Sequence, residues 1–218
     1  MTTYPNSPRV LKAGLVLLDA ESSAVQRIIT LQYNPDTLSR TLQPQFVKDT
    51  GDRSEAMRLT GPPVETIKLD AEIDATDQLE FPAQNSTTVQ HGIQPQLAAL
   101  ETIVYPASAQ LLSNNAMARA GMLEILPMIS SLVLFIWSRS RIVPVRVTDF
   151  SITEEAFDPA LNPIRAKVSL GMRVLSVNDI GFDNKGGGLF LAYQQMKEQL
   201  AAKAPGGSLN LFGIENIP

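Results

Sequence analysis

Residues 143–177 constrain the fold more than any other part of the sequence, because they alternate like two amphipathic strands joined by an acidic connection rich in Pro and Asn. In the second strand the apolar side chains share one parity, as a half-buried strand requires. They are Ile164, Ala166, Val168, Leu170, Met172 and Val174. In the first strand the apolar parity changes between Val147 and Phe150. This change, near Asp149, predicts a β-bulge or a change of packing environment.

The composition excludes several classes of protein. At 218 residues the chain suits a single domain and can bury a large core without a disulfide or a structural metal. The absence of cysteine excludes thiol nucleophiles and Cys-ligated zinc or iron–sulfur sites. A net charge of −4 gives no general attraction for nucleic acid. We therefore expect no nucleic-acid partner.

No segment has the pattern of a targeting signal. The first 14 residues contain Pro and polar residues where a signal peptide has a basic start and an apolar run, so we expect assembly in the cytoplasm. The longest apolar stretch, residues 125–138, contains Pro127 and is shorter than the ~20 residues of a membrane-spanning helix. It is interpreted as a buried strand, and no direct membrane insertion is expected.

Alternation predicts further strands at 10–19 and 26–33, joined by a hairpin-like turn. An extended segment follows at 38–47, and Pro44 confines it to a sheet edge or a bulge because proline cannot donate to the ladder. Residues 67–75 also alternate, with an acidic outer face. That face is opposite in sign to the basic outer face of the second strand described above.

These patterns predict a mainly β, α+β fold in one domain spanning residues 1–204. Within it we expect an exposed loop at 48–63 and a helical insertion at 95–123. Helical spacing at 189–200 predicts a last helix. Residues 205–218 then form a flexible hinge and an apolar tail, which would dock on something.

No group of residues has the pattern of an active site. His91 is the only histidine and has no assignable partner, and the three carboxylates within 154–158 lack an aromatic sugar-binding cleft. The acidic row of the 67–75 strand could bind a hard cation, but a solvated strand face explains it as well. The glycines at 186–188 lack a phosphate-binding motif and suggest a flexible lead-in to the helix. We therefore expect no catalytic residue, no cofactor and no metal.

Three motifs together resemble the signature of a known family. They are LQYNPDTLSR (31–40), ALETIVYP (99–106) and VRVTDFSITEEAFDPALNPIRAKVSLGMRVL (145–175). These motifs resemble the tube-initiator, or tube-cap, proteins of contractile injection systems, which are phage-tail-like particles. The resemblance covers most of residues 10–180, and the third motif is its specific part. It implies a phage tail-tube-like fold in which two packed antiparallel sheets form a small sandwich or barrel with flanking helices.

The resemblance also implies a structural, non-enzymatic role. Such a subunit assembles as a hexameric ring between the inner tube protein and the spike protein, beside other baseplate components, and it nucleates tube assembly. Proteins of this type commonly carry a LysM-like module after the tube-like domain. This sequence ends soon after its last helix and so resembles a short form without that module. The particle could be released or anchored at a membrane.

Two alternatives stay open. One is a main inner-tube subunit of the same particle, and the other is a glycan-binding or glycan-cleaving β-sandwich of phage-tail origin. For the leading interpretation, subunit contacts are predicted at two turns. The first turn contributes Asn34, Pro35 and Leu38, and the second contributes Phe157, Pro159, Asn162 and Pro163. The same residues fit ordinary turn chemistry about as well.

Overall fold

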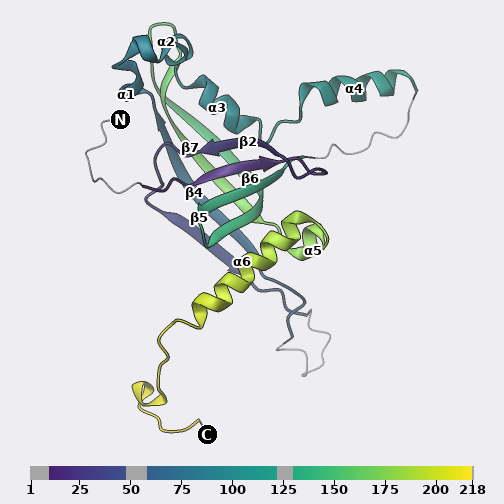
Figure 1. Ribbon diagram of the computed structural model, residues 1–218, viewed down its shortest axis with the longest axis vertical. Helices are drawn as coiled ribbons and strands as arrows, with labels where there is room; N and C mark the ends of the chain where they lie inside the picture. The colour runs from purple at the N-terminus through teal and green to yellow at the C-terminus, as the bar shows by residue number, and fades with distance from the viewer. Residues whose placement is uncertain (1–9, 48–57, 122–129, 218) are drawn as a thin grey trace.

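The computed structural model describes residues 10–47, 58–121 and 130–217 (Figure 1). Its seven strands form one antiparallel sheet in the order β2-β1-β5-β6-β7-β4-β3. The strands are β1 (Gly14–Leu18), β2 (Val25–Thr30), β3 (Leu38–Gln43), β4 (Val64–Asp74), β5 (Leu132–Ser138), β6 (Arg141–Phe157) and β7 (Pro163–Val174). The predicted α+β class is confirmed.

The helical elements lie between β4 and β5 and after β7. They are α1 (Thr76–Leu79), η2 (Pro82–Gln84), α2 (Ser86–His91), α3 (Gln94–Glu101), α4 (Ser108–Arg119), α5 (Val177–Ile180), α6 (Lys185–Ala201) and the 3-10 turn η3 (Leu209–Phe212). In the part of the chain that the structure describes, none of these helices has both the length and the apolar character needed to cross a membrane.

Strand β6 explains why the strands form one sheet where the family resemblance implied two. Its first residues, up to Val145, pair with β5, and the rest pair with β7 as far as Phe157. The register shifts between Val147 and Asp149, which confirms the bulge predicted from the change of parity. A bulge bends the strand and increases its twist, so one long strand can take part in both halves of a curled sheet.

The core lies on one face of this sheet and draws residues from both halves. Its most deeply buried side chains are Ile67, Val143, Ala166, Val168 and Met172. The apolar parity predicted for β7 is therefore the buried one, although Ile164 at its start is only half-buried. Buried side chains from α3 and α6 complete the core.

Helices α3 and α4 form the segment predicted as a helical insertion at 95–123, with α3 beginning one residue earlier, at Gln94. Pro95 lies in the first turn of α3, where its missing N–H removes no helical hydrogen bond, and Leu97 and Leu100 of this helix are buried. No residue of α4 is buried, and Figure 1 shows this helix standing away from the sheet. Residues 122 and 123 lie outside the described residues.

Helix α6 follows its predicted apolar stripe in part. The sequence pattern predicted a stripe of Leu189, Tyr193, Met196 and Leu200. Tyr193 is buried, Leu189 and Met196 are half-buried, and Leu200 is exposed. The other buried residues of α6 are Gly186, Gly187 and Phe190. The glycines belong to the first helical turn and are not a flexible lead-in. A Cβ on Gly187 would lie 2.0 Å from the Gly181 carbonyl oxygen, so this position accepts only glycine. The first turn of α6 thus lies against the backbone that follows α5.

Candidate functional site

The sheet is open, and its two edges are the strands β2 and β3. Among the described residues, no strand pairs with the outer edge of either one. Both edges expose apolar side chains: Ile28 on β2 is 64% exposed and Leu42 on β3 is 46% exposed. Unpaired strand edges offer rows of backbone donors and acceptors to another chain. The prediction from Pro44 that this segment lies at a sheet edge is confirmed.

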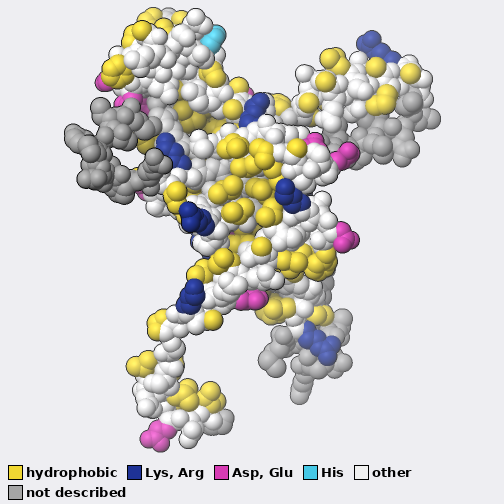
Figure 2. Space-filling view, viewed as in Figure 1, with side chains coloured by type: hydrophobic (Ala, Val, Ile, Leu, Met, Phe, Trp, Pro, Cys, Tyr) yellow, Lys and Arg dark blue, Asp and Glu magenta, His cyan; other side chains and the backbone are white. Residues whose placement is uncertain are grey.

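Figure 2 shows apolar side chains gathered on one face over β2 and β5, on α4 and along the C-terminal tail. The exposed apolar residues of these elements are Val25, Ile28, Leu111, Leu112, Met117, Leu211, Phe212, Ile214 and Ile217. The tail residues 209–217 make only local backbone hydrogen bonds. The apolar tail, predicted to dock on another surface, therefore stays exposed in the isolated chain.

The first predicted contact turn is tied to its own chain. Asn34 Oδ1 accepts a hydrogen bond from the Ala13 N–H at 2.9 Å, and its Nδ2 donates to the Leu11 carbonyl at 2.7 Å. These bonds hold the segment that leads into β1. Pro35 is half-buried, and Leu38 opens β3 and packs against the core. Asn34 therefore has a structural role within its own chain, joining this turn to the start of β1, and the contact role of the turn stays a prediction.

The second predicted contact turn is a rigid loop between β6 and β7. The Asp158 carboxylate accepts hydrogen bonds from the Ala160 and Asn162 N–H groups and from Asn162 Nδ2, each at 2.8 Å. Hydrogen bonds from Asn162 hold the pKa of Asp158 below its usual value. Phe157 and Pro159 are exposed. The loop is therefore pre-organised and presents apolar side chains.

Two other predicted members of that turn, Asn162 and Pro163, contact the rest of the chain, and a third residue, Leu161, was not predicted. Asn162 Nδ2 also donates to the Gln90 carbonyl at 3.2 Å, and Pro163 is buried. Leu161 is 77% exposed and has a positive φ of 66°. Positive φ is unusual for leucine and marks a constrained backbone. Its only signal in the sequence is its place in the turn DPALNP.

The two predicted turns are not brought together. In the sheet register, Leu38 of β3 lies opposite Leu69 of β4, which in turn lies opposite Leu170 of β7. Phe157 of β6 lies opposite Pro163, at the start of β7. Leu170 and Pro163 are roughly 20 Å apart along β7 at the usual rise of a strand. The turns therefore belong to separate surfaces.

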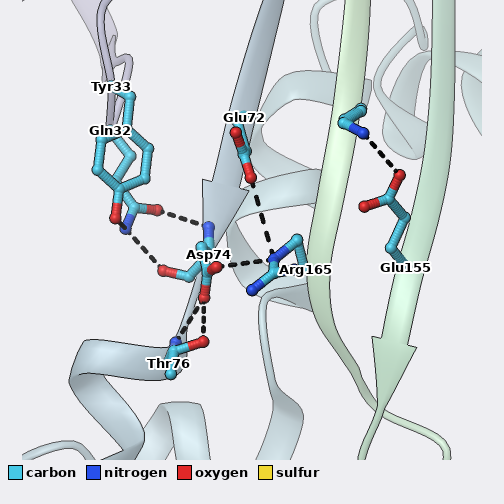
Figure 3. A network of polar contacts seen from close by, with 8 residues as sticks. Gln32, Tyr33, Glu72, Asp74, Thr76, Glu155 and Arg165 are labelled. Atoms are coloured by element: carbon cyan, nitrogen blue, oxygen red, sulfur yellow. Dashed lines mark hydrogen bonds and ion pairs between the residues drawn. The ribbon is translucent and has the colours of Figure 1, made fainter.

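Charged side chains on the outer face of the sheet pair across the strands (Figure 3). Arg165 Nε lies 2.7 Å from Asp74 Oδ2 and 3.9 Å from Glu72 Oε1, and Lys167 Nζ lies 3.0 Å from Glu155 Oε1. The faces of opposite sign predicted for β4 and β7 are thus neighbours in one sheet. Within the described residues, no group of three or more His, Asp or Glu side chains has a geometry that could hold a metal ion.

Gln32 adds a contact between distant parts of the sheet. Its side-chain Oε1 accepts from the Asp74 N–H at 3.0 Å, and its Nε2 donates to the Asp74 carbonyl at 2.6 Å (Figure 3). Gln32 follows β2, whereas Asp74 ends β4, which lies five places away in the strand order. The sheet therefore curls until its two halves meet at this end.

The pairing of Asp74 predicts a pH-dependent effect of substitution Arg165→Met. Burial raises the pKa of Asp74, but hydrogen bonds from Thr76 and Arg165 outweigh it and hold that pKa below its usual value. Such a carboxylate stabilises the fold above its unfolded-state pKa near 4, and the contribution is lost as pH falls through the folded pKa.

We therefore expect Arg165→Met to lower the free energy of unfolding by about 0.5 kcal/mol at neutral pH, since the arginine is partly exposed. The difference from wild type should shrink as the pH falls below about 4. Urea denaturation at a series of pH values measures it. A difference that stays the same at acid pH would contradict this role for Arg165.

One apolar groove lies between β6 and the connection from α3 to α4. Its apolar lining residues are Val104, Tyr105, Val147, Phe150 and Ile152. Among the described residues, no segment of the chain covers this groove. Glu101 is its only charged lining residue, so the groove holds no cluster of titratable groups.

No protein-family model matches the sequence, and no curated protein matches it at a significant level. Among solved structures, a chain from the tail of an empty gene transfer agent particle, determined with C6 symmetry, matches 74% of this chain and 90% of its own length. The identity is 14% and the TM-score is 0.27.

Proposed function

We propose that this chain is a non-enzymatic structural subunit of a phage-tail-like particle, which closes into a ring by pairing the β2 edge of one copy with the β3 edge of the next. The open sheet is the observation that carries this proposal. Each edge strand has six residues, neither edge has a strand partner in the described part of the chain, and both expose apolar side chains. Strand addition at such edges is a common mode of protein association.

A contact between the β2 edge of one copy and the β3 edge of another is heterologous. Each copy therefore binds one neighbour through β2 and a second neighbour through β3. Heterologous contacts produce rings when the rotation closes and filaments when it does not. The resemblance of the three motifs to tube initiators favours a ring of six, assembled in the cytoplasm and set between the inner tube and the spike. The outer face of β4 and β7 needs no partner, because its charges already pair within the sheet.

Axial neighbours would use other surfaces. Helix α4 and residues 209–217 expose apolar side chains and lie away from the sheet (Figure 1). Large exposed apolar patches are typical of interaction sites. These segments, together with the 154–163 connection, are the proposed contacts to the layers above and below.

The test uses two charge substitutions, Ile28→Lys on β2 and Leu42→Lys on β3. Both side chains are exposed, so the monomer should fold normally, but a lysine on a strand edge opposes pairing. We expect rings of the wild-type chain by negative-stain microscopy and monomers of each variant by light scattering. A mixture of the two variants should stop at dimers. The intact β3 edge of Ile28→Lys can pair with the intact β2 edge of Leu42→Lys, and the two edges left over both carry a lysine.

Three outcomes would contradict the proposal. A wild-type chain that stays monomeric at its highest soluble concentration argues against self-assembly. Rings that persist in both variants place the contact elsewhere. Dimers formed by either variant alone indicate contact between identical edges.

Long tubes formed by the wild-type chain alone would favour the main inner-tube subunit over the initiator, which should stop at a ring until tube protein is added.

A further inference from the structure

A buried carboxylate joins the last helix to an edge strand. Glu65 on β4 is 2% exposed and lies at the centre of a polar cluster. Its Oε1 accepts from Arg40 Nε at 2.7 Å and from the Tyr193 hydroxyl at 3.1 Å, and its Oε2 accepts from Lys197 Nζ at 3.1 Å. Arg40 belongs to β3, and the other two donors belong to α6.

The donors also contact one another. Arg40 Nη2 donates to the Tyr193 hydroxyl oxygen at 2.9 Å, and Lys197 Nζ lies 4.0 Å from the centre of the Tyr193 ring. Burial raises the pKa of Tyr193 to about 12, with a contribution from Glu65. Burial also raises the pKa of Glu65, but Arg40 and Lys197 outweigh it and the net shift is downward. The carboxylate is therefore ionised and the tyrosine protonated at physiological pH.

The two halves of helix α6 differ in how they contact the rest of the protein. The buried residues of α6, from Gly186 to Tyr193, all lie in its first half. After Tyr193 no residue of α6 is buried, and Leu200 is exposed. In the described part of the chain, Lys197 to Glu65 is the last hydrogen bond between this helix and the sheet. Beyond it, the chain runs into the exposed tail.

We infer that residues 194–217, here called the C-terminal arm, are held on the sheet edge by the Glu65 cluster acting as a polar latch, and that the arm can detach while the rest of the fold stays intact. Elements with few buried apolar contacts open locally at lower free energy than the core. The contacts of the latch are charge-assisted hydrogen bonds, which require defined geometry. Because Arg40 lies on β3, the latch ties the arm to one of the two open edges.

This inference concerns the single chain and does not rest on the proposed ring. An isolated monomer suffices to test it, so its failure and the failure of ring assembly are separate results. The test is hydrogen–deuterium exchange, read by mass spectrometry on peptides from the full-length chain. The informative peptides cover 194–201 of α6, 38–43 of β3 and the paired strands β6 and β7.

Substitution Lys197→Gln removes the hydrogen bond between the arm and Glu65 and leaves Arg40 and Tyr193 paired with that carboxylate. We expect exchange in 194–201 to rise roughly tenfold or more, since hydrogen bonds to charged groups are the stronger class. Exchange in 38–43 and in β6 and β7 should stay unchanged. Substitution Glu65→Gln removes the charge that both sides share and should raise exchange in 194–201 and in 38–43 together.

The control is Glu155→Gln, which breaks the exposed pair with Lys167 and should leave exchange in α6 unchanged. Unchanged exchange in 194–201 after Lys197→Gln would overturn the latch, as would a wild-type arm with no measurable protection. A rise of equal size in β6 and β7 would mean global destabilisation and would also overturn the inference, because the arm would then not open by itself.

Discussion

Substitution Gly92→Ala is expected to lower the free energy of unfolding by about 3 kcal/mol or more. Gly92 ends α2 with φ 56° and ψ −132°, a backbone conformation that costs other residues roughly 1–3 kcal/mol. A Cβ at this position would also lie 2.1 Å from the Pro163 carbonyl oxygen. That oxygen accepts the Ile93 N–H at 2.9 Å, so the clash opposes a hydrogen bond between the helical segment and β7. Urea denaturation measures the loss.

The matched control is Gly188→Ala in α6. A Cβ there meets nothing within 4 Å, and the residue is inside a helix, where alanine is favoured over glycine by roughly 0.5–1 kcal/mol. We therefore expect Gly188→Ala to be neutral or stabilising. A Gly92→Ala variant as stable as wild type would show that the junction of α2, α3 and β7 is not fixed as described.

The sequence predicted the parts of the fold that depend on local pattern. The parity of β7, the bulge after Val147 and the position of β3 at an edge all follow from side-chain period and from Pro44. The register could not be predicted, because it joins residues distant in the chain. Asp74 pairs with Arg165, for example, and β5 lies between β1 and β6. Face polarity identifies which side of a strand is buried but not which strand lies beside it.

The same distinction applies to the candidate site. Asp158 lies within the second predicted turn, and its hydrogen bonds are to nearby backbone, as turn chemistry requires. The partners of Asn34 could not be read in this way, because they are the backbone groups of Leu11 and Ala13, more than 20 residues earlier. The exposed edge residues Ile28 and Leu42 were not identified, since edge exposure depends on strand order. Glu65 did leave a signal: it has the same parity as Ile67 and the other buried side chains of β4. A carboxylate on an apolar parity indicates a buried, paired charge.

A pair of phenylalanine substitutions separates the stability of the fold from its assembly. Phe135 on β5 is 1% exposed, and its ring centre lies 6.0 Å from that of Trp137. Phe135→Ala removes a buried aromatic side chain and leaves a cavity, so we expect a loss of about 3–5 kcal/mol. For a chain of this length the melting temperature should fall by roughly 10 °C. Thermal and urea denaturation measure both quantities.

Phe157→Ala makes the same chemical change where the side chain is 49% exposed, at the end of β6. Little apolar area is removed from the core, so the free energy of unfolding should change by only about 0.5 kcal/mol. If Phe157 is a subunit contact, as predicted from the turn, the variant should instead form fewer assemblies than wild type at equal concentration. Apolar anchors at an interface contribute to association, whereas core side chains contribute to folding. Equal losses of stability in both variants would contradict the burial described for β5, and unchanged assembly of Phe157→Ala would remove this residue from the interface.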